Sequence, residues 1–169
     1  MATDGNTTSD KATTDEDLTA HFVQVTGASH IYRVLVPLDD TVRYCTADDC
    51  APEEVQVIFE GKGTLIFIDQ YDHGSSHSSY CQAGRERFLR IVRIPREAAK
   101  AGKTKGDEQS TLRSDVNIKL ESCFDNIELL EEGVVNWIPS TSTLRIDWLS
   151  GPGREHTEQS MTFQFREDG

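Results

Sequence analysis

The chain has 169 residues, which fits one domain with one core. Hydrophobic residues make up 36% of the chain and charged residues 27%, as in ordinary soluble globular domains. No apolar run approaches the roughly 20 residues that a membrane-spanning helix needs. The formal net charge of −12 is opposite to that of a typical nucleic-acid-binding module, so we expect no nucleic-acid partner.

The first twenty residues are poor in apolar side chains: after Met1, the first large one is Leu18. Such a segment buries too little surface to offset its chain entropy, which predicts a disordered acidic leader over 1–20 and a single folded domain over 21–169. The leader lacks the basic start and apolar stretch of a secretory signal. The chain is therefore either cytosolic or one from which a signal or lipid anchor has been removed.

From residue 21 onward, apolar residues recur with a period of two far more often than with the helical period of 3.6. In "DVNIKLES" the apolar residues are Val116, Ile118 and Leu120, and in "QSMTFQFRE" they are Met161, Phe163 and Phe165. These segments read as half-buried strands. Further strands are predicted in "HIYRVLVPL", "TVRYC", "EVQVIFE", "TLIFIDQ", "RFLRIVRI", "NIELLEE", "VVNW" and "TLRIDWLS".

Two pairs of these segments predict antiparallel hairpins. "EVQVIFE" and "TLIFIDQ" flank the three residues 61–63, whose glycines favour a tight turn, and "VVNW" and "TLRIDW" flank "IPSTS". Evidence for helix is thin, because only "PREAAKAGK" fits one or two turns, within a predicted exposed loop over 95–111. The predicted fold is all-β: a single antiparallel β-sandwich or small barrel of about eight or nine strands, with little helix.

A basic segment interrupts the acidic chain between residues 85 and 105. It holds eight basic residues against two acidic ones, a net charge of +6 that leaves −18 on the rest. Only Phe88 is an aromatic residue within it, so it lacks the aromatic interleaving of a nucleic-acid surface. We expect its arginines to pair with carboxylates on neighbouring strands.

The four cysteines allow three disulfide connectivities. We favour Cys45 with Cys50 and Cys81 with Cys123, because "CTADDC" closes a short local loop. Four reduced cysteines in a cytosolic protein remain the alternative. Two bridges would place the chain in the periplasm or outside the cell, where disulfides persist.

The segment "YDHGSSHSSYC", residues 71–81, concentrates side chains that serve in several kinds of site. Its His73 and His77, together with Cys45 and Cys50, are ligand types that zinc selects, although the gap between the two pairs is longer than in a zinc finger. Its serines and histidines lack the strand-to-helix elbow of a serine hydrolase. We therefore expect a contact loop rather than a reaction centre, with no catalytic residue and no cofactor.

The same segment resembles the inhibitory loop of periplasmic lysozyme inhibitors, which are small acidic β proteins. Those proteins insert a loop of pattern Ser-Gly-x-x-Tyr into the cleft of the enzyme. This chain has Ser76-His77-Ser78-Ser79-Tyr80, which matches at the serine and the tyrosine and has histidine in place of glycine. More broadly, "YCQAGRERFLRIV" and "SCFDNIEL" resemble segments of small exported bacterial proteins of inhibitor or immunity type.

These observations predict a non-enzymatic exported binding protein that neutralises a basic protein partner, either a lysozyme-like hydrolase or an interbacterial toxin, because an acidic protein is steered toward a basic cleft. The candidate partner-binding residues are Asp48, Asp49, Asp72, His73, Ser76, His77 and Tyr80. One alternative is a zinc-binding or hydrolytic domain that uses His73 and His77. Another is a structural module of a cell envelope, such as the head of a lipoprotein.

Overall fold

The computed structural model describes residues 20–39, 42, 51–72, 84–97, 111–131, 135–153 and 157–166. Strands hold 68% of the described residues, and helical residues occur among them only at 42 and 96–97, so the all-β prediction is confirmed. The strands are β1 (Ala20–Thr26), β2 (Ile31–Pro37), β3 (Glu54–Gly61), β4 (Thr64–Asp72), β5 (Arg85–Arg93), β6 (Thr111–Ser122), β7 (Glu128–Leu129), β8 (Val135–Ile138), β9 (Thr143–Ser150) and β10 (Gln159–Gln164).

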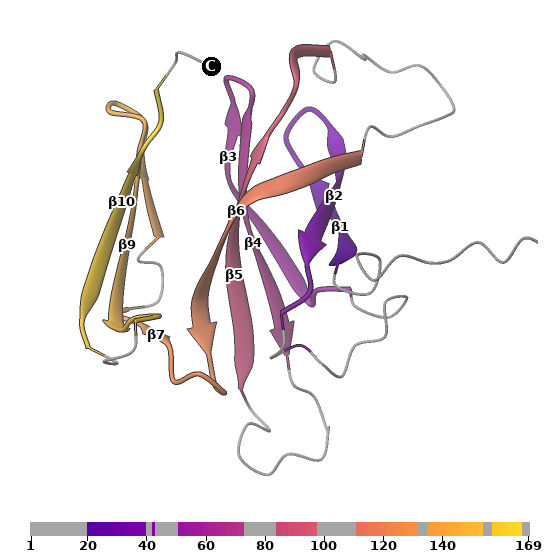
Figure 1. Ribbon diagram of the computed structural model, residues 1–169. Coiled ribbons are helices and arrows are strands. Elements are labelled where there is room, and N and C mark those ends of the chain that lie inside the picture. The colour runs from indigo at the N-terminus through magenta and orange to yellow at the C-terminus, as the bar shows by residue number, and fades with distance from the viewer. Residues whose placement is uncertain are drawn as a thin grey trace, which may run out of the picture.

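Two sheets pack on each other (Figure 1). The larger has six strands in the order β1-β2-β6-β5-β4-β3, and the smaller has the order β10-β9-β7, with β8 also pairing with β9. All pairs are antiparallel except β2 with β6, which run parallel, so the larger sheet is mixed and not purely antiparallel as predicted. The chain between β2 and β6 forms the three strands β3, β4 and β5 before it returns to pair with β2. The alternation within each strand does not reveal this long-range pairing.

Both predicted hairpins are present. β3 and β4 pair from Glu54 with Gln70 to Gly61 with Thr64, so the connection is the two-residue turn Lys62–Gly63 and not the predicted three residues. Both turn residues have positive φ, 50° and 71°, as a type I′ hairpin turn requires. β8 and β9 pair across residues 139–142, in agreement with the predicted "IPSTS" connection.

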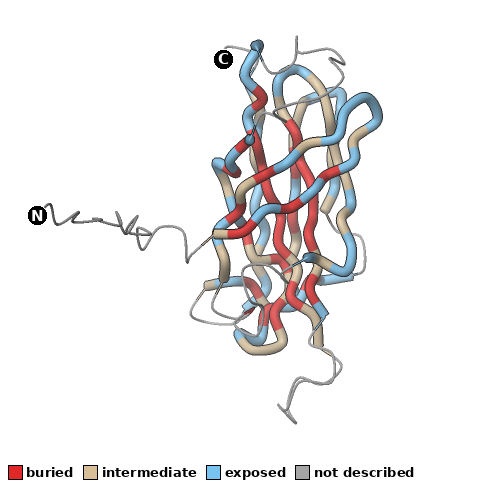
Figure 2. The backbone as a smooth tube through the Cα atoms, turned by 90° about the vertical axis from the view of Figure 1, so that its right-hand side faces the viewer, coloured by how far each residue is buried: buried red, intermediate tan, exposed pale blue. Residues whose placement is uncertain are grey.

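The larger sheet is curled, so that β4 and β5 are buried on both faces. Inside the curl lies a core of mainly aliphatic residues from β1, β2, β4, β5 and β6, which includes Val23, Val34, Leu65 and Phe67. The opposite face packs on the smaller sheet through a second core that includes Ile68, Leu89, Leu120 and Trp148. Buried residues therefore run along the central strands (Figure 2).

Glu60 of β3 joins the two margins of the curled sheet. Its carboxylate accepts hydrogen bonds of 2.6 Å from the Ala28 N–H and from the Tyr32 hydroxyl, both of the β1–β2 hairpin. A Cβ on Gly27 would lie 2.3 Å from Glu60 Oε2, so this close approach depends on glycine. Burial and the Glu60 carboxylate raise the pKa of Tyr32. The contact holds β1 near β3 and closes the curl.

A bulge in β6 switches which side chains face each core. The register with β5 shifts between Ile91 and Val92, so Asp115 is an extra residue on β6. After the bulge, Val116, Ile118 and Leu120 face the smaller sheet, as the predicted alternation required. Trp148 of the smaller sheet donates its indole N–H to the Leu120 carbonyl at 3.1 Å, which links the two layers.

Candidate functional site

Only one of the seven predicted partner-binding residues lies in the described part of the chain. Asp72 is the last residue of β4, is exposed, and pairs in register with Arg85 at the start of β5. The Gln70 side-chain amide donates to Asp72 Oδ1 at 3.0 Å. The other six predicted contact residues lie outside the described residues: Asp48, Asp49, His73, Ser76, His77 and Tyr80.

The strands on either side of segment 73–83 form a rigid support. β4 and β5 pair without a register shift over their whole length, from Thr64 with Arg93 to Asp72 with Arg85. Next to this end, Tyr71 of β4 and Phe88 of β5 are buried in a third small core with Val42, which holds the strand ends that flank the segment. The candidate site is therefore built around this end of the β4–β5 hairpin.

Exposed carboxylates gather at this end of the sheet. The Glu53 N–H donates to the Gln70 carbonyl at 2.8 Å, and Glu54 pairs in register with Gln70, two residues before Asp72. Glu53, Glu54 and Asp72 are all exposed. Sequence reasoning singled out Asp72 alone, because the pairing that brings Glu53 and Glu54 beside it depends on hairpin register.

The arginines at this end are bound to a carboxylate of β6. Glu121 Oε2 lies 3.3 Å from Arg85 Nε and accepts a hydrogen bond of 2.8 Å from Arg87 Nη1. Farther along β5, Arg90 binds Asp69 in the interior. The prediction that these arginines pair with carboxylates on neighbouring strands at the sheet surface is confirmed for Arg85 and Arg87, whereas Arg90 pairs in the interior.

An open pocket of about 590 Å³ lies beside this end of β5, between β5, the end of β6 and the smaller sheet. Arg85, Glu121 and Cys123 are among the residues that line it. The turn after β6 is well ordered by hydrogen bonds: the Asp125 N–H donates to Ser122 Oγ, and Ser150 Oγ donates to the Asn126 carbonyl. A side chain of a bound partner would meet one cation, Arg85, and two carboxylates, Glu121 and Glu128, here. Arg85 and Glu121 are already paired with each other.

Of the four cysteines, the structure describes Cys123, which directly follows β6. Its N–H donates to Oε1 of the buried Glu86 at 3.1 Å. Cys45, Cys50 and Cys81 lie outside the described residues, so the two predicted bridges remain predictions.

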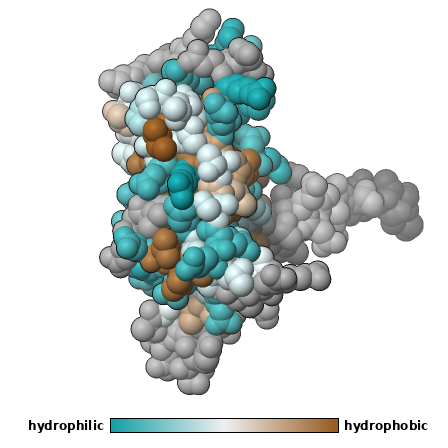
Figure 3. Space-filling view, turned by 90° about the vertical axis from the view of Figure 1, so that its left-hand side faces the viewer, coloured by the Kyte–Doolittle hydropathy of each residue, from teal (hydrophilic) through white to brown (hydrophobic). Residues whose placement is uncertain are grey.

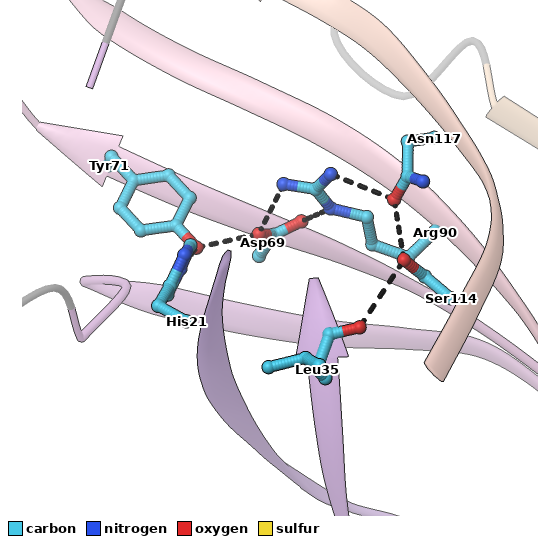
Figure 4. Close-up of polar contacts among 7 residues, drawn as sticks. All are labelled: His21, Leu35, Asp69, Tyr71, Arg90, Ser114 and Asn117. Atoms are coloured by element: carbon cyan, nitrogen blue, oxygen red, sulfur yellow. Dashed lines mark hydrogen bonds and ion pairs between the residues drawn. The ribbon is translucent and has the colours of Figure 1, made fainter. Parts of the chain in front are cut away.

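A buried polar network inside the curl is the feature that sequence reasoning missed (Figure 4). Arg90 donates to both carboxylate oxygens of Asp69, at 2.8 and 3.0 Å, and to Asn117 Oδ1 at 2.9 Å. The Tyr71 hydroxyl donates to Asp69 Oδ2 at 2.7 Å, and His21 Nε2 lies 2.6 Å from the same hydroxyl. The sequence does carry a signal for this network: each of two apolar strands has a charged residue at an inward position, Asp69 in β4 and Arg90 in β5.

The network fixes the protonation of His21. Because the Tyr71 hydroxyl donates its only proton to Asp69, the Nε2–H of the imidazole must donate to the Tyr71 oxygen, and Nδ1 is left as a buried lone pair with no hydrogen-bond partner. Burial lowers the pKa of His21; the Asp69 carboxylate opposes this effect and Arg90 adds to it. His21 is therefore neutral in the folded protein at neutral pH.

The network is enclosed. Asp69 is 0% exposed and His21 and Tyr71 are each 4% exposed, so a substrate cannot touch these groups without displacing the strands around them. The arrangement suits a structural role: it satisfies charges inside a curled sheet.

No metal-binding cluster of three or more His, Cys, Asp or Glu side chains occurs among the residues that the structure describes. The ligands of the zinc hypothesis, His73, His77, Cys45 and Cys50, lie outside those residues. Within the described ranges, no helix is long and apolar enough to cross a membrane. Comparison with known protein families, curated proteins and solved structures found no match to the chain.

Proposed function

We propose that the protein is a non-enzymatic binding domain that neutralises a basic partner protein, and that the partner contacts the end of the β4–β5 hairpin and segment 73–83. The observation that carries this proposal is the distribution of charge at that end. Glu53, Glu54 and Asp72 are exposed, whereas Arg85 and Arg87 share Glu121. The field that a partner meets there is therefore negative.

The distribution of charge also favours a protein partner over a nucleic acid. The basic segment that interrupts the chain has three of its arginines bound to Glu121 and Asp69. Two carboxylates therefore offset two of these three positive charges, and the net charge of −12 on the whole chain repels phosphate and attracts cationic surfaces. Attraction of this kind raises the association rate more than it raises the affinity.

The kind of partner follows from the resemblance of residues 76–80 to the inhibitory loop of periplasmic lysozyme inhibitors. A lysozyme-like hydrolase or a toxin delivered by a competitor would present a basic cleft. Binding would rest on a few anchors, with Tyr80 as the first candidate and His73, Ser76 and His77 beside it. Asp48 and Asp49 would add negative charge. The protein would act in the periplasm or outside the cell, where the predicted disulfides persist.

A lysis assay tests this function. Purified full-length protein is mixed with lysozyme and bacterial cell walls, and the rate of wall lysis is measured. We expect dose-dependent inhibition that Tyr80→Ala weakens without loss of folding by circular dichroism. Absence of inhibition would remove the lysozyme-like partner. One stoichiometric zinc ion in protein purified without chelator would instead favour the zinc-binding alternative built on His73 and His77.

A further inference from the structure

Among the residues that the structure describes, the outer margin of β10 is a sheet edge without the usual protection against pairing with another strand. Its sequence, QSMTFQ, contains no charged residue, proline or glycine, and its register with β9 has no bulge. The other described edges differ: β1 lies near β3, which carries Glu54 and Glu60, and β7 and β8 have only two and four residues. β10 is therefore an uncharged edge of six residues, and among the described strands only β9 pairs with it.

The backbone groups that face this edge follow from the pairing with β9. The Phe165 N–H donates to the Ser142 carbonyl at 2.9 Å, so Phe165 and the alternate residues Phe163 and Met161 direct their backbone groups toward β9. The residues between them, Ser160, Thr162 and Gln164, direct theirs toward the open edge.

The side chains of β10 alternate between the two faces of the smaller sheet. Met161 and Phe163 pair with the buried Ile146 and Leu144 and so face the larger sheet. Met161 is nevertheless 39% exposed, because no strand covers it from the open side in the described part of the chain. On the outer face the Ser160 hydroxyl donates to Asp147 at 2.6 Å. This face of the smaller sheet carries scattered apolar spots among polar side chains (Figure 3).

We propose that β10 is a self-association edge: two copies of the chain pair their β10 strands antiparallel about a two-fold axis at Thr162. The sequence around Thr162 is complementary to itself in this register. Glu158 stands opposite Arg166 of the partner copy on the outer face, and Met161 stands opposite Phe163 of the partner copy on the inner face. Ser160, Thr162 and Gln164 exchange backbone hydrogen bonds with their opposite residues.

The strand that pairs with this edge is β10 of a second copy, because the charges of Glu158 and Arg166 are complementary in that pairing. Glu158 and Arg166 are both exposed, and they lie at equal distances from Thr162 along the strand with opposite signs. Between them the strand is neutral, so two chains of net charge −12 meet there without like charges in register. The pairing would join the two smaller sheets into one continuous sheet and cover the exposed flank of Met161.

Charge reversal in the full-length protein tests the proposal, with sedimentation velocity over a concentration series as the measurement. We expect a concentration-dependent dimer for the unmodified protein. Glu158→Lys and Arg166→Glu each replace two attractions by two repulsions and should weaken self-association about tenfold. The double variant Glu158→Lys/Arg166→Glu should restore it. A monomer at all concentrations, or single and double variants with equal affinity, would overturn the proposal.

Disulfide trapping provides a second test on the same protein. Thr162→Cys places a cysteine on the two-fold axis and should give a covalent dimer on mild oxidation, read on a non-reducing gel. Gln164→Cys is the matched control, because in this register its neighbour is Ser160 of the other copy and not a second cysteine. Equal crosslinking by both variants, or crosslinking by Gln164→Cys alone, would contradict the register.

Discussion

Asp69 and Arg90 form a two-point ion pair across β4 and β5 inside the curled sheet, and their side chains are 0% and 2% exposed. The guanidinium reaches both carboxylate oxygens and continues to Asn117, while Tyr71 donates to the same carboxylate. A buried pair of this kind adds little stability over apolar residues of the same volume, but breaking it is costly, because the remaining charge has no partner.

Removal of either member of this pair is expected to destabilise the fold strongly. Asp69→Ala and Arg90→Ala should each lower the free energy of unfolding by about 3–5 kcal/mol. The double variant should lose much less than the sum of the two, since no unpaired charge remains. Urea unfolding measures all three. Arg145→Ala, which breaks the exposed pair with Asp147, is the control and should change stability little. Additive losses in the double variant would contradict the pairing.

His21 makes stability depend on pH. Its pKa is lowered in the folded protein relative to the ordinary value of 6.5, chiefly by burial. Below pH 6.5 the unfolded chain therefore binds a proton that the folded chain does not, so the free energy of unfolding falls as the pH is lowered from 6.5 toward the folded pKa. Above pH 6.5 this loss is absent.

The measurement compares urea unfolding at pH 7.5 and pH 5.5 for the unmodified protein and for His21→Gln. The glutamine amide still donates to Tyr71 but does not titrate in this range, so the variant should lose less stability on acidification. His30→Gln changes an exposed histidine and serves as the control. An equal loss in the unmodified protein and in His21→Gln would show that His21 does not carry the pH dependence.

Glu60→Gln is expected to loosen the closure of the curled sheet. Glu60 accepts from both Ala28 and Tyr32, one donor on each oxygen, and a glutamine side chain has only one oxygen to offer. The loss should be about 1–3 kcal/mol in urea unfolding, with faster hydrogen exchange in the β1–β2 hairpin. Glu54→Gln changes an exposed residue of the same strand and should leave both quantities unchanged.

Peptide mapping of non-reduced native protein tests the predicted bridges. We expect Cys45 linked to Cys50 and Cys81 linked to Cys123. Reduction of the longer bridge should then destabilise the protein by about 4 kcal/mol in the chain-entropy model. Four free thiols would place the protein in a reducing compartment and remove the main support for an exported role.

The sequence predicts the strands well because alternation is a local property. The inward residues of β6 and β10, such as Ile118 and Phe163, lie on the predicted face. The parallel pairing of β2 with β6 and the second core inside the curl were not predictable, because they depend on which strands meet across long stretches of chain. The first strand, β1, contributes Val23 and Val25 to that inner core, although the sequence alternation predicts no separate strand there.

The candidate site was predictable only where a single residue carried the signal. Asp72 is exposed at a strand end, as the sequence suggested. Its acidic neighbours Glu53 and Glu54 come from the other strand of the hairpin, and only the register between β3 and β4 brings them close. The arginines of β5 were expected to meet carboxylates, but the burial of Arg90 follows from the curl of the sheet, which no local pattern encodes.

The association rate with a basic hydrolase tests the central claim most directly. Binding of lysozyme to the immobilised protein is followed by surface plasmon resonance at low and high salt. Glu54→Gln/Asp72→Asn removes two charges at the proposed contact end, and Glu97→Gln/Glu131→Gln removes two exposed charges elsewhere. We predict salt-sensitive binding that the first pair of substitutions slows and the second leaves nearly unchanged. No binding at low salt, or equal slowing by both pairs, would contradict a partner-binding surface at the β4–β5 end.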